Sequence, residues 1–148
     1  MAKFSKARYS RGWIVLLATL IGLSYGGYTY VHRAITAQVY IENCGHVDYK
    51  PKVILKFCAD AGVGIADIDW TQWSASQAEG TAKYSANDCN PTCVAGKFSS
   101  AEVYVKLSKL KKINGKDAFT YIQVETKDGT PLPLLKSKDD EWSLEMAG

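Results

Sequence analysis

The sequence has few of the residues from which hydrolytic enzymes build their active sites. Only two of its 148 residues are His, and of these only His46 lies in the part of the chain that we expect to fold as a domain. A catalytic triad joins a nucleophile to a His, and the chain contains no G-x-S-x-G nucleophile elbow. We therefore predict a protein without enzymatic activity and without a cofactor.

The sequence also lacks a general excess of positive charge. Its formal net charge is +3, but four of the cations precede His32 with no acidic residue among them: Lys3, Lys6, Arg8 and Arg11. From residue 32 onward, the remaining 14 of the 18 basic residues stand against all 15 acidic residues, a net charge of −1. Because nucleic-acid-binding domains present a basic surface, we predict no nucleic-acid partner.

No charged residue lies between Arg11 and His32. As a helix rising ~1.5 Å per residue, residues 13–31 would reach about 28 Å, close to the ~30 Å of a bilayer's hydrocarbon core. Most of the flanking cations precede this run, so the positive-inside rule keeps residues 1–12 in the cytoplasm as a basic tip. We predict a signal-anchor helix that crosses the lipid bilayer of the cell membrane once, followed by a stalk at 32–38.

A cleaved signal peptide is the alternative for the same apolar run. Its most apolar part ends at Leu23, and Ser24-Tyr25-Gly26 offers small residues at the −3 and −1 positions of a cleavage site. An uncleaved helix would anchor the protein, whereas cleavage would make it a secreted one. In both cases the rest of the chain is predicted to be extracytoplasmic.

All four cysteines, Cys44, Cys58, Cys89 and Cys93, lie in the part of the chain that we expect to be exported. An even number of cysteines in an oxidising compartment predicts two disulfides. Three pairings are possible, and we favour the local one, Cys44 with Cys58 and Cys89 with Cys93. In the chain-entropy model a five-residue loop contributes about 2 kcal/mol and a fifteen-residue loop about 3 kcal/mol.

The segment D-C-N-P-T-C, residues 88–93, also has a spacing known from redox and metal-binding pairs. Copper sites of this kind add a nearby His and Met, and the residues after Cys93 supply neither. A zinc site needs closely spaced ligands on both arms, which the other two cysteines do not offer. Asp88 beside Cys89 disfavours the thiolate that redox exchange requires. A copper or thiol-redox carrier is therefore the least favoured function.

From residue 39 onward the sequence has no apolar stripe of helical period and instead alternates between apolar and polar residues. The predicted strands lie at 39–42, 52–57, 65–70 and 80–86, and on either side of Asn114-Gly115. Asn-Gly is typical of the type I′ hairpin turn, which needs positive φ at both positions. We predict an all-β domain at 39–127, a small antiparallel β-sandwich of immunoglobulin-like type stapled by disulfides.

The alternation also predicts which apolar side chains share a face. The expected sets are Val53, Leu55 and Phe57; Val103, Val105 and Leu107; and Ile122 and Val124. After the second hairpin strand we predict a polar tail at 128–148, in which Trp142 and Leu144 are candidates for an edge strand.

The segment D-W-T-Q-W places Trp70 and Trp73 an odd number of residues apart, so a continuous strand would point them to opposite faces. The alternative that we favour is that both rings are largely buried. In the other case one lies in the core and the other is exposed, with Tyr84 or Tyr104 near it. Such exposed rings would stack on a sugar or anchor a partner protein.

Five lysines gather on the predicted hairpin: Lys106, Lys109, Lys111, Lys112 and Lys116. They are suited to anionic lipid or to an anionic envelope polymer. The alternative is that they only solvate the hairpin and protect a sheet edge.

Residues 44–125 carry a series of motifs, C-x-D, W-x2-W, A-x-G and C-x-P-x-C-x2-G. The matching positions are Cys58, Asp60, Trp70, Trp73, Ala78, Gly80, Cys89, Pro91, Cys93 and Gly96. In this pattern the chain resembles a group of uncharacterised exported or membrane-anchored proteins of actinobacteria. The resemblance implies export and a disulfide-bearing β domain, and it implies no chemistry.

Together these features predict a single-pass membrane protein with an extracytoplasmic β-sandwich. We expect it to act as a non-catalytic protein-interaction, accessory or structural module of the cell envelope, with an envelope protein as partner. A module that binds a glycan or envelope polymer through an exposed Trp is the alternative.

Overall fold

The computed structural model describes residues 11–36 and 38–145, which belong to two compact units, Met1–Ala37 and Gln38–Gly148. The first unit contains the helix α1, Arg11–Thr36. Its stretch Ile14–Val31 is long and apolar enough to cross a membrane. Hydroxyl groups within it donate to carbonyls one turn earlier, as Thr19 Oγ1 does to Val15 O at 2.6 Å, so they are satisfied without water.

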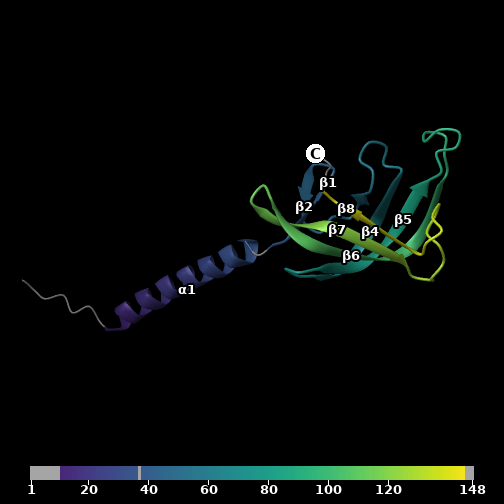
Figure 1. The fold of residues 1–148 in the computed structure, drawn as a ribbon. Helices are drawn as coiled ribbons and strands as arrows, with labels where there is room; N and C mark the ends of the chain where they lie inside the picture. Colours follow the sequence, from purple (N-terminus) through teal and green to yellow (C-terminus); the bar gives the residue numbers. More distant parts are fainter. Residues whose placement is uncertain (1–10, 37, 146–148) are drawn as a thin grey trace, which may run out of the picture. The chain divides into compact units, whose positions relative to one another are not determined.

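The second unit consists of strands (Figure 1). Their bounds are β1 Tyr40–Asn43, β2 His46–Asp48, β3 Ile54–Leu55, β4 Val63–Trp73, β5 Ala78–Asn87, β6 Phe98–Ile113, β7 Lys116–Thr126 and β8 Asp139–Ser143. The strand order is β2-β1-β7-β6-β5-β4-β3, and β8 also pairs with β7. All pairs are antiparallel except β1 with β7. The predicted all-β fold is confirmed: one sheet curls into a half-barrel, whose opposed parts supply the two layers expected of a sandwich.

Side chains join β1, the strand with which the domain begins, to β3, which lies at the far end of the strand order. The Asn43 amide acts as a piece of strand, since its Oδ1 accepts from Leu55 N at 2.9 Å and its Nδ2 donates to Leu55 O at 2.8 Å. The next residue along forms the disulfide Cys44–Cys58, with Cα atoms 5.4 Å apart. These contacts link β1 to β3 although the two strands are not neighbours in the sheet.

The predicted Asn114-Gly115 hairpin is confirmed, with φ angles of 50° and 80° at the two residues. The burial predicted for β6 and β7 is confirmed as well: Val103, Val105, Leu107, Ile122 and Val124 are all at most 2% exposed. Against them β5 places small residues, among them Ala78, Ala82 and Ala86. Gly80 is required there, because a Cβ at this position would lie 2.4 Å from Asp69 O.

The burial predicted for 52–57 is wrong. Val53 and Phe57 are exposed, at 52% and 51%, whereas Ile54 between them is fully buried. The reason is the length of β3, which contains only Ile54 and Leu55 and pairs Ile54 with Ile65 of β4. Val53 and Phe57 lie outside these two paired residues, so strand alternation does not determine which way their side chains point.

The β domain also extends beyond residue 127, where we predicted a polar tail. Strand β8 pairs with β7 from Asp139 to Ser143, and Trp142 and Leu144 are 8% and 5% exposed. Leu132 in the preceding loop is buried too. The edge strand suggested by Trp142 and Leu144 is present and completes the core.

Candidate binding face

The exposed face of the sheet is hollowed across β4 to β8, forming a groove of about 500 Å³ that we call the outer-face groove. Because alternate residues of a strand share a face, the register aligns its exposed side chains in two rows. The first row is Thr81, Tyr104, Glu125 and Asp139, and the second is Glu79, Lys106, Gln123 and Glu141. The volume lies within the ~300–1,000 Å³ typical of ligand sites.

Tyr104 is the aromatic residue of the outer-face groove. Its side chain is 57% exposed and lies between Thr81 of β5 and Glu125 of β7. Lys127 Nζ lies 5.9 Å from the ring centroid. The strands on both sides fix the backbone of Tyr104, so the ring is a platform on a rigid sheet and not on a loop.

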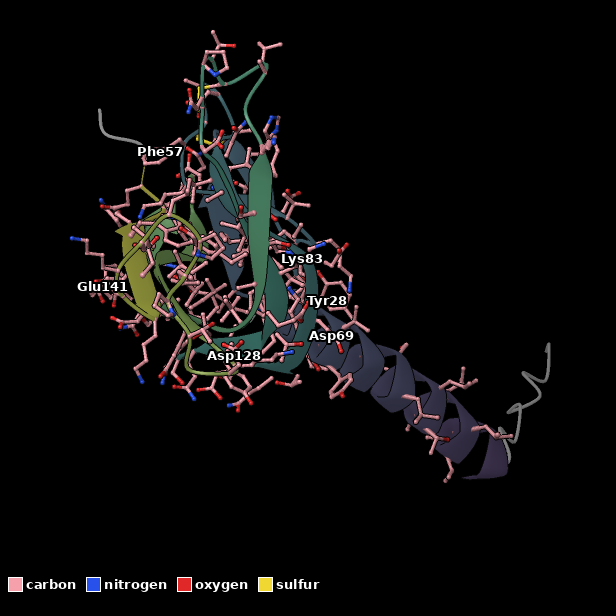
Figure 2. The ribbon with its side chains drawn as sticks, turned by 90° about the vertical axis from the view of Figure 1, so that its right-hand side faces the viewer. Tyr28, Phe57, Asp69, Lys83, Asp128 and Glu141 are labelled. Carbon is pink, nitrogen blue, oxygen red and sulfur yellow. A yellow bond between two sulfur atoms is a disulfide. The ribbon has the colours of Figure 1, made fainter. Side chains whose placement is uncertain are left out.

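Polar side chains beside Tyr104 form short ladders across the strands. In the second row, Lys106 Nζ lies 3.4 Å from Glu79 Oε1, and Gln123 Nε2 donates to Glu141 Oε2 at 3.2 Å. In Figure 2, Glu141 points outward from β8. Carboxylates outnumber cations among the lining residues, so the lining of the groove is acidic.

Lys138 lies next to the groove and forms an ion pair with Glu125, one of the lining residues. Lys138 Nζ lies 2.5 Å from Glu125 Oε1. The hydrogen bond and the charge of Glu125 raise the pKa of the Lys138 ammonium above its usual value. Both side chains are more than half exposed, so this pair orients Glu125 more than it stabilises the fold.

Trp70 and Trp73 do not point to opposite faces, so that prediction is wrong. The register of β4 against β5 shifts between Trp70 and Gln72, which is a bulge. The two indole rings therefore contact each other edge to face, with centroids 4.8 Å apart. Their N–H groups donate to Pro51 O at 2.8 Å and Val39 O at 3.0 Å. Both tryptophans are half-buried and hold neighbouring segments in place.

Tyr84 is likewise not part of an exposed surface. It is 1% exposed, and its hydroxyl donates to Asp140 Oδ2 at 3.3 Å. Asp140 also forms an ion pair with Lys56 at 2.7 Å. Burial, followed by the charge of Asp140, raises the pKa of the Tyr84 phenol far above its usual value. Of the four aromatic residues proposed for binding, only Tyr104 lies in the groove.

Both locally paired disulfides are present, Cys44–Cys58 and Cys89–Cys93, and no described cysteine is free. Asn87 fixes the loop of the second, since its Nδ2 donates to Cys93 O at 2.8 Å and its Oδ1 accepts from Cys89 N at 2.9 Å. Asp88 accepts from the backbone N–H groups of Lys97 and Asn90, which lower the pKa of its carboxyl group. The D-C-N-P-T-C segment is therefore a stapled loop.

Within residues 11–36 and 38–145, no group of three or more His, Cys, Asp or Glu side chains is arranged to hold a metal ion. The candidate site is the outer-face groove, because it combines an exposed aromatic ring with flanking polar side chains. Sequence reasoning named Tyr104, and Lys106 only as a hairpin lysine, because the two rows exist only once the register of four strands is set.

Comparison with known proteins returned no matching protein family, no matching curated protein and no matching solved structure. The fold and site define an all-β, disulfide-stapled domain that follows an apolar helix. The resemblance to exported actinobacterial proteins stays a prediction.

Proposed function

We propose that this protein is a single-pass membrane protein whose extracytoplasmic β domain works by binding and not by catalysis. α1 acts as an uncleaved anchor, with the basic N-terminal tip in the cytoplasm and the domain outside. Its support is the apolar stretch Ile14–Val31, the four cations before it and the two disulfides, which persist in oxidising compartments.

The domain serves as an interaction or accessory module of the cell envelope, and the outer-face groove is its binding face. The observation that carries this proposal is the exposed Tyr104 ring in the centre of a groove on rigid strands. Aromatic anchors in such positions dominate the energetics of many interfaces. We infer an envelope protein as the partner.

Site-specific photo-crosslinking tests this assignment. A benzophenone amino acid replaces Tyr104 in the full chain, and in a matched control it replaces Phe98, which is 62% exposed on the same strand but outside the groove. We expect one stoichiometric adduct with a membrane protein from position 104 and none from position 98. The same adduct from both positions, or from position 98 alone, would contradict the groove as the binding face.

A glycan is the second candidate ligand, because hydroxyl, amide and carboxylate groups flank the Tyr104 ring. In this second candidate function, Tyr104 takes the stacking role that the sequence analysis assigned to an exposed Trp. Titration calorimetry with cell-wall polysaccharides distinguishes it: Tyr104→Phe keeps a stacking ring and should keep affinity, whereas Tyr104→Ala should lose it. Absence of heat with the unmodified chain would remove this candidate.

A further inference from the structure

The tip of the β6–β7 hairpin concentrates the positive charge of the domain. Residues 38–148 contain 13 Lys and 15 acidic residues, a net charge of −2. The segment 109–119, here named the lysine arm, contains four Lys and one Asp, a net charge of +3. The remainder of the domain therefore carries −5. The charge of the domain is separated in space, since its acidic groove lies on other parts of the strands.

The lysines of the arm are presented to solvent. Lys111 and Lys112 have side chains 63% and 71% exposed. Their ion pairs with Glu145 at 2.7 Å and Asp117 at 2.9 Å are exposed pairs, which are weak and yield to competing anions. Counting Glu145 with the arm still leaves a net charge of +2.

The other two lysines of the arm lie over aromatic rings. Lys109 Nζ lies 3.5 Å from the centroid of Tyr121, and Lys116 Nζ lies 4.6 Å from that of Tyr40. No ion pair joins either lysine to a carboxylate within the described part of the chain. A cation held over a ring keeps its full charge and its capacity to bind an anion.

The arm lies beside the strand with which the domain begins. β1 pairs in parallel with β7, joining Tyr40 to Ala118 and Ile41 to Phe119. In the sequence, Tyr40 follows Val31, the end of the apolar stretch, by nine positions. Five of these continue α1 at ~1.5 Å per residue, and the other four span at most about 14 Å when extended. Chain connectivity alone therefore keeps the arm within reach of a membrane that α1 crosses.

The same end of the domain exposes rings and an aliphatic side chain. Leu110 in the arm is 45% exposed, and Tyr49 is 44% exposed. Tyr49 contacts Tyr40, with ring centroids 6.1 Å apart, and Lys50 Nζ lies 5.5 Å from the Tyr49 ring. Tyrosine and lysine together suit the headgroup region of a bilayer, where a ring or stem is covered while the polar end stays wet.

We propose that the lysine arm binds the anionic headgroups of the membrane in which α1 is anchored. This proposal rests on the single-pass anchoring proposed above. The arm supplies cations for lipid phosphates, while Leu110 and Tyr49 supply apolar surface for the layer beneath. A soluble anionic polymer would satisfy the cations but offers no such layer. Binding at this point would restrict the rotation of the domain about its tether.

Hydrogen exchange of the full chain in lipid nanodiscs tests the proposal. The discs contain either phosphatidylcholine alone or a mixture with phosphatidylglycerol, at ~0.15 M and ~0.5 M salt, where the Debye length falls from about 8 Å to about 4 Å. One lysine near an anionic surface is worth about fivefold in partition. We expect exchange at residues 110–118 to slow about fivefold or more in the anionic discs at low salt, and high salt to remove the effect.

Two double variants distinguish binding by the lysine arm from a general effect of positive charge. Lys111→Gln with Lys116→Gln should abolish the slowing, whereas Lys83→Gln with Lys97→Gln, an equal change at exposed positions outside the arm, should leave it. Equal exchange in both lipids, equal effects of both variants, or slowing by added anionic polymer without anionic lipid would each overturn the proposal. Incorporation of the chain into discs is measured first. A chain that does not incorporate refutes the proposed membrane anchor. A chain that incorporates but shows no slowing of exchange in anionic discs refutes lipid binding by the lysine arm.

Discussion

The side chain of Asn43 substitutes for strand pairing between β1 and β3, and its removal gives a direct measure of that closure. Asn43→Ala deletes two hydrogen bonds, of 2.8 and 2.9 Å, and leaves the N–H and C=O of Leu55 without them. An unsatisfied buried polar group costs about 1–3 kcal/mol. Because Leu55 is half-buried, water replaces part of the loss. We expect the free energy of unfolding to fall by about 2–3 kcal/mol.

Urea unfolding of the full chain under non-reducing conditions, followed by tryptophan fluorescence, measures this loss. Trp70, Trp73 and Trp142 all report on the β domain. The matched control is Gln72→Ala, an exposed amide, for which the change should stay within about 0.5 kcal/mol. A loss below about 0.5 kcal/mol for Asn43→Ala would refute the reasoning, because the disulfide alone would then suffice to hold β1 to β3.

Three further outcomes follow from the structure. Gly80→Ala should destabilise the domain by about 2 kcal/mol or more, since its new Cβ would lie 2.4 Å from Asp69 O, and urea unfolding checks this. Tyr84 should ionise later than ordinary tyrosines in an absorbance titration at alkaline pH, because its folded pKa is raised above the usual 10.0; stability from this group is complete below about pH 10 and declines above it. Replacing Cys89 and Cys93 together by Ala should cost about 2 kcal/mol, measured in the same unfolding assay.

Each of these experiments has a control within the chain. Gly129→Ala has open space for a Cβ but a φ of 74°, so its loss reports backbone strain without a steric clash. Tyr84→Phe should remove the late-ionising group, and its persistence would contradict the assignment. For the disulfides, intact mass under non-reducing conditions should be about 4 Da below the fully reduced mass; a smaller difference would contradict two closed bridges.

The second half of the domain was predictable from the sequence because its local signals agree. Asn114-Gly115 demands one turn type, and that turn fixes the register of β6 against β7 and hence the burial of Val103 and Ile122. The pairing of the cysteines was favoured by proximity in the chain. Short-range chemistry was sufficient in both cases.

The remainder depended on contacts that the sequence does not display. The φ of 52° at Asp67 breaks the alternation of β4 and allows both Ile65 and Ile68 to face the core. A second irregularity brings Trp70 and Trp73 together. Neither Asp67 nor the segment 70–72 contains a glycine that would have indicated a bulge from the sequence. The outer-face groove, too, requires the mutual register of strands far apart in the chain.

The position of the Cys44–Cys58 bridge matters for how the domain bears load. If the chain is anchored as proposed, a pull from the proposed partner on the outer face is resisted through residue 38, where the chain enters the domain at β1. Unaided, β1 would peel from β7, with which it shares only two register pairs, Tyr40 with Ala118 and Ile41 with Phe119. The covalent bond directly after β1 passes the tension to β3. The Cys44–Cys58 disulfide thus allows β1, a short and weakly paired strand, to serve as a mechanical attachment point.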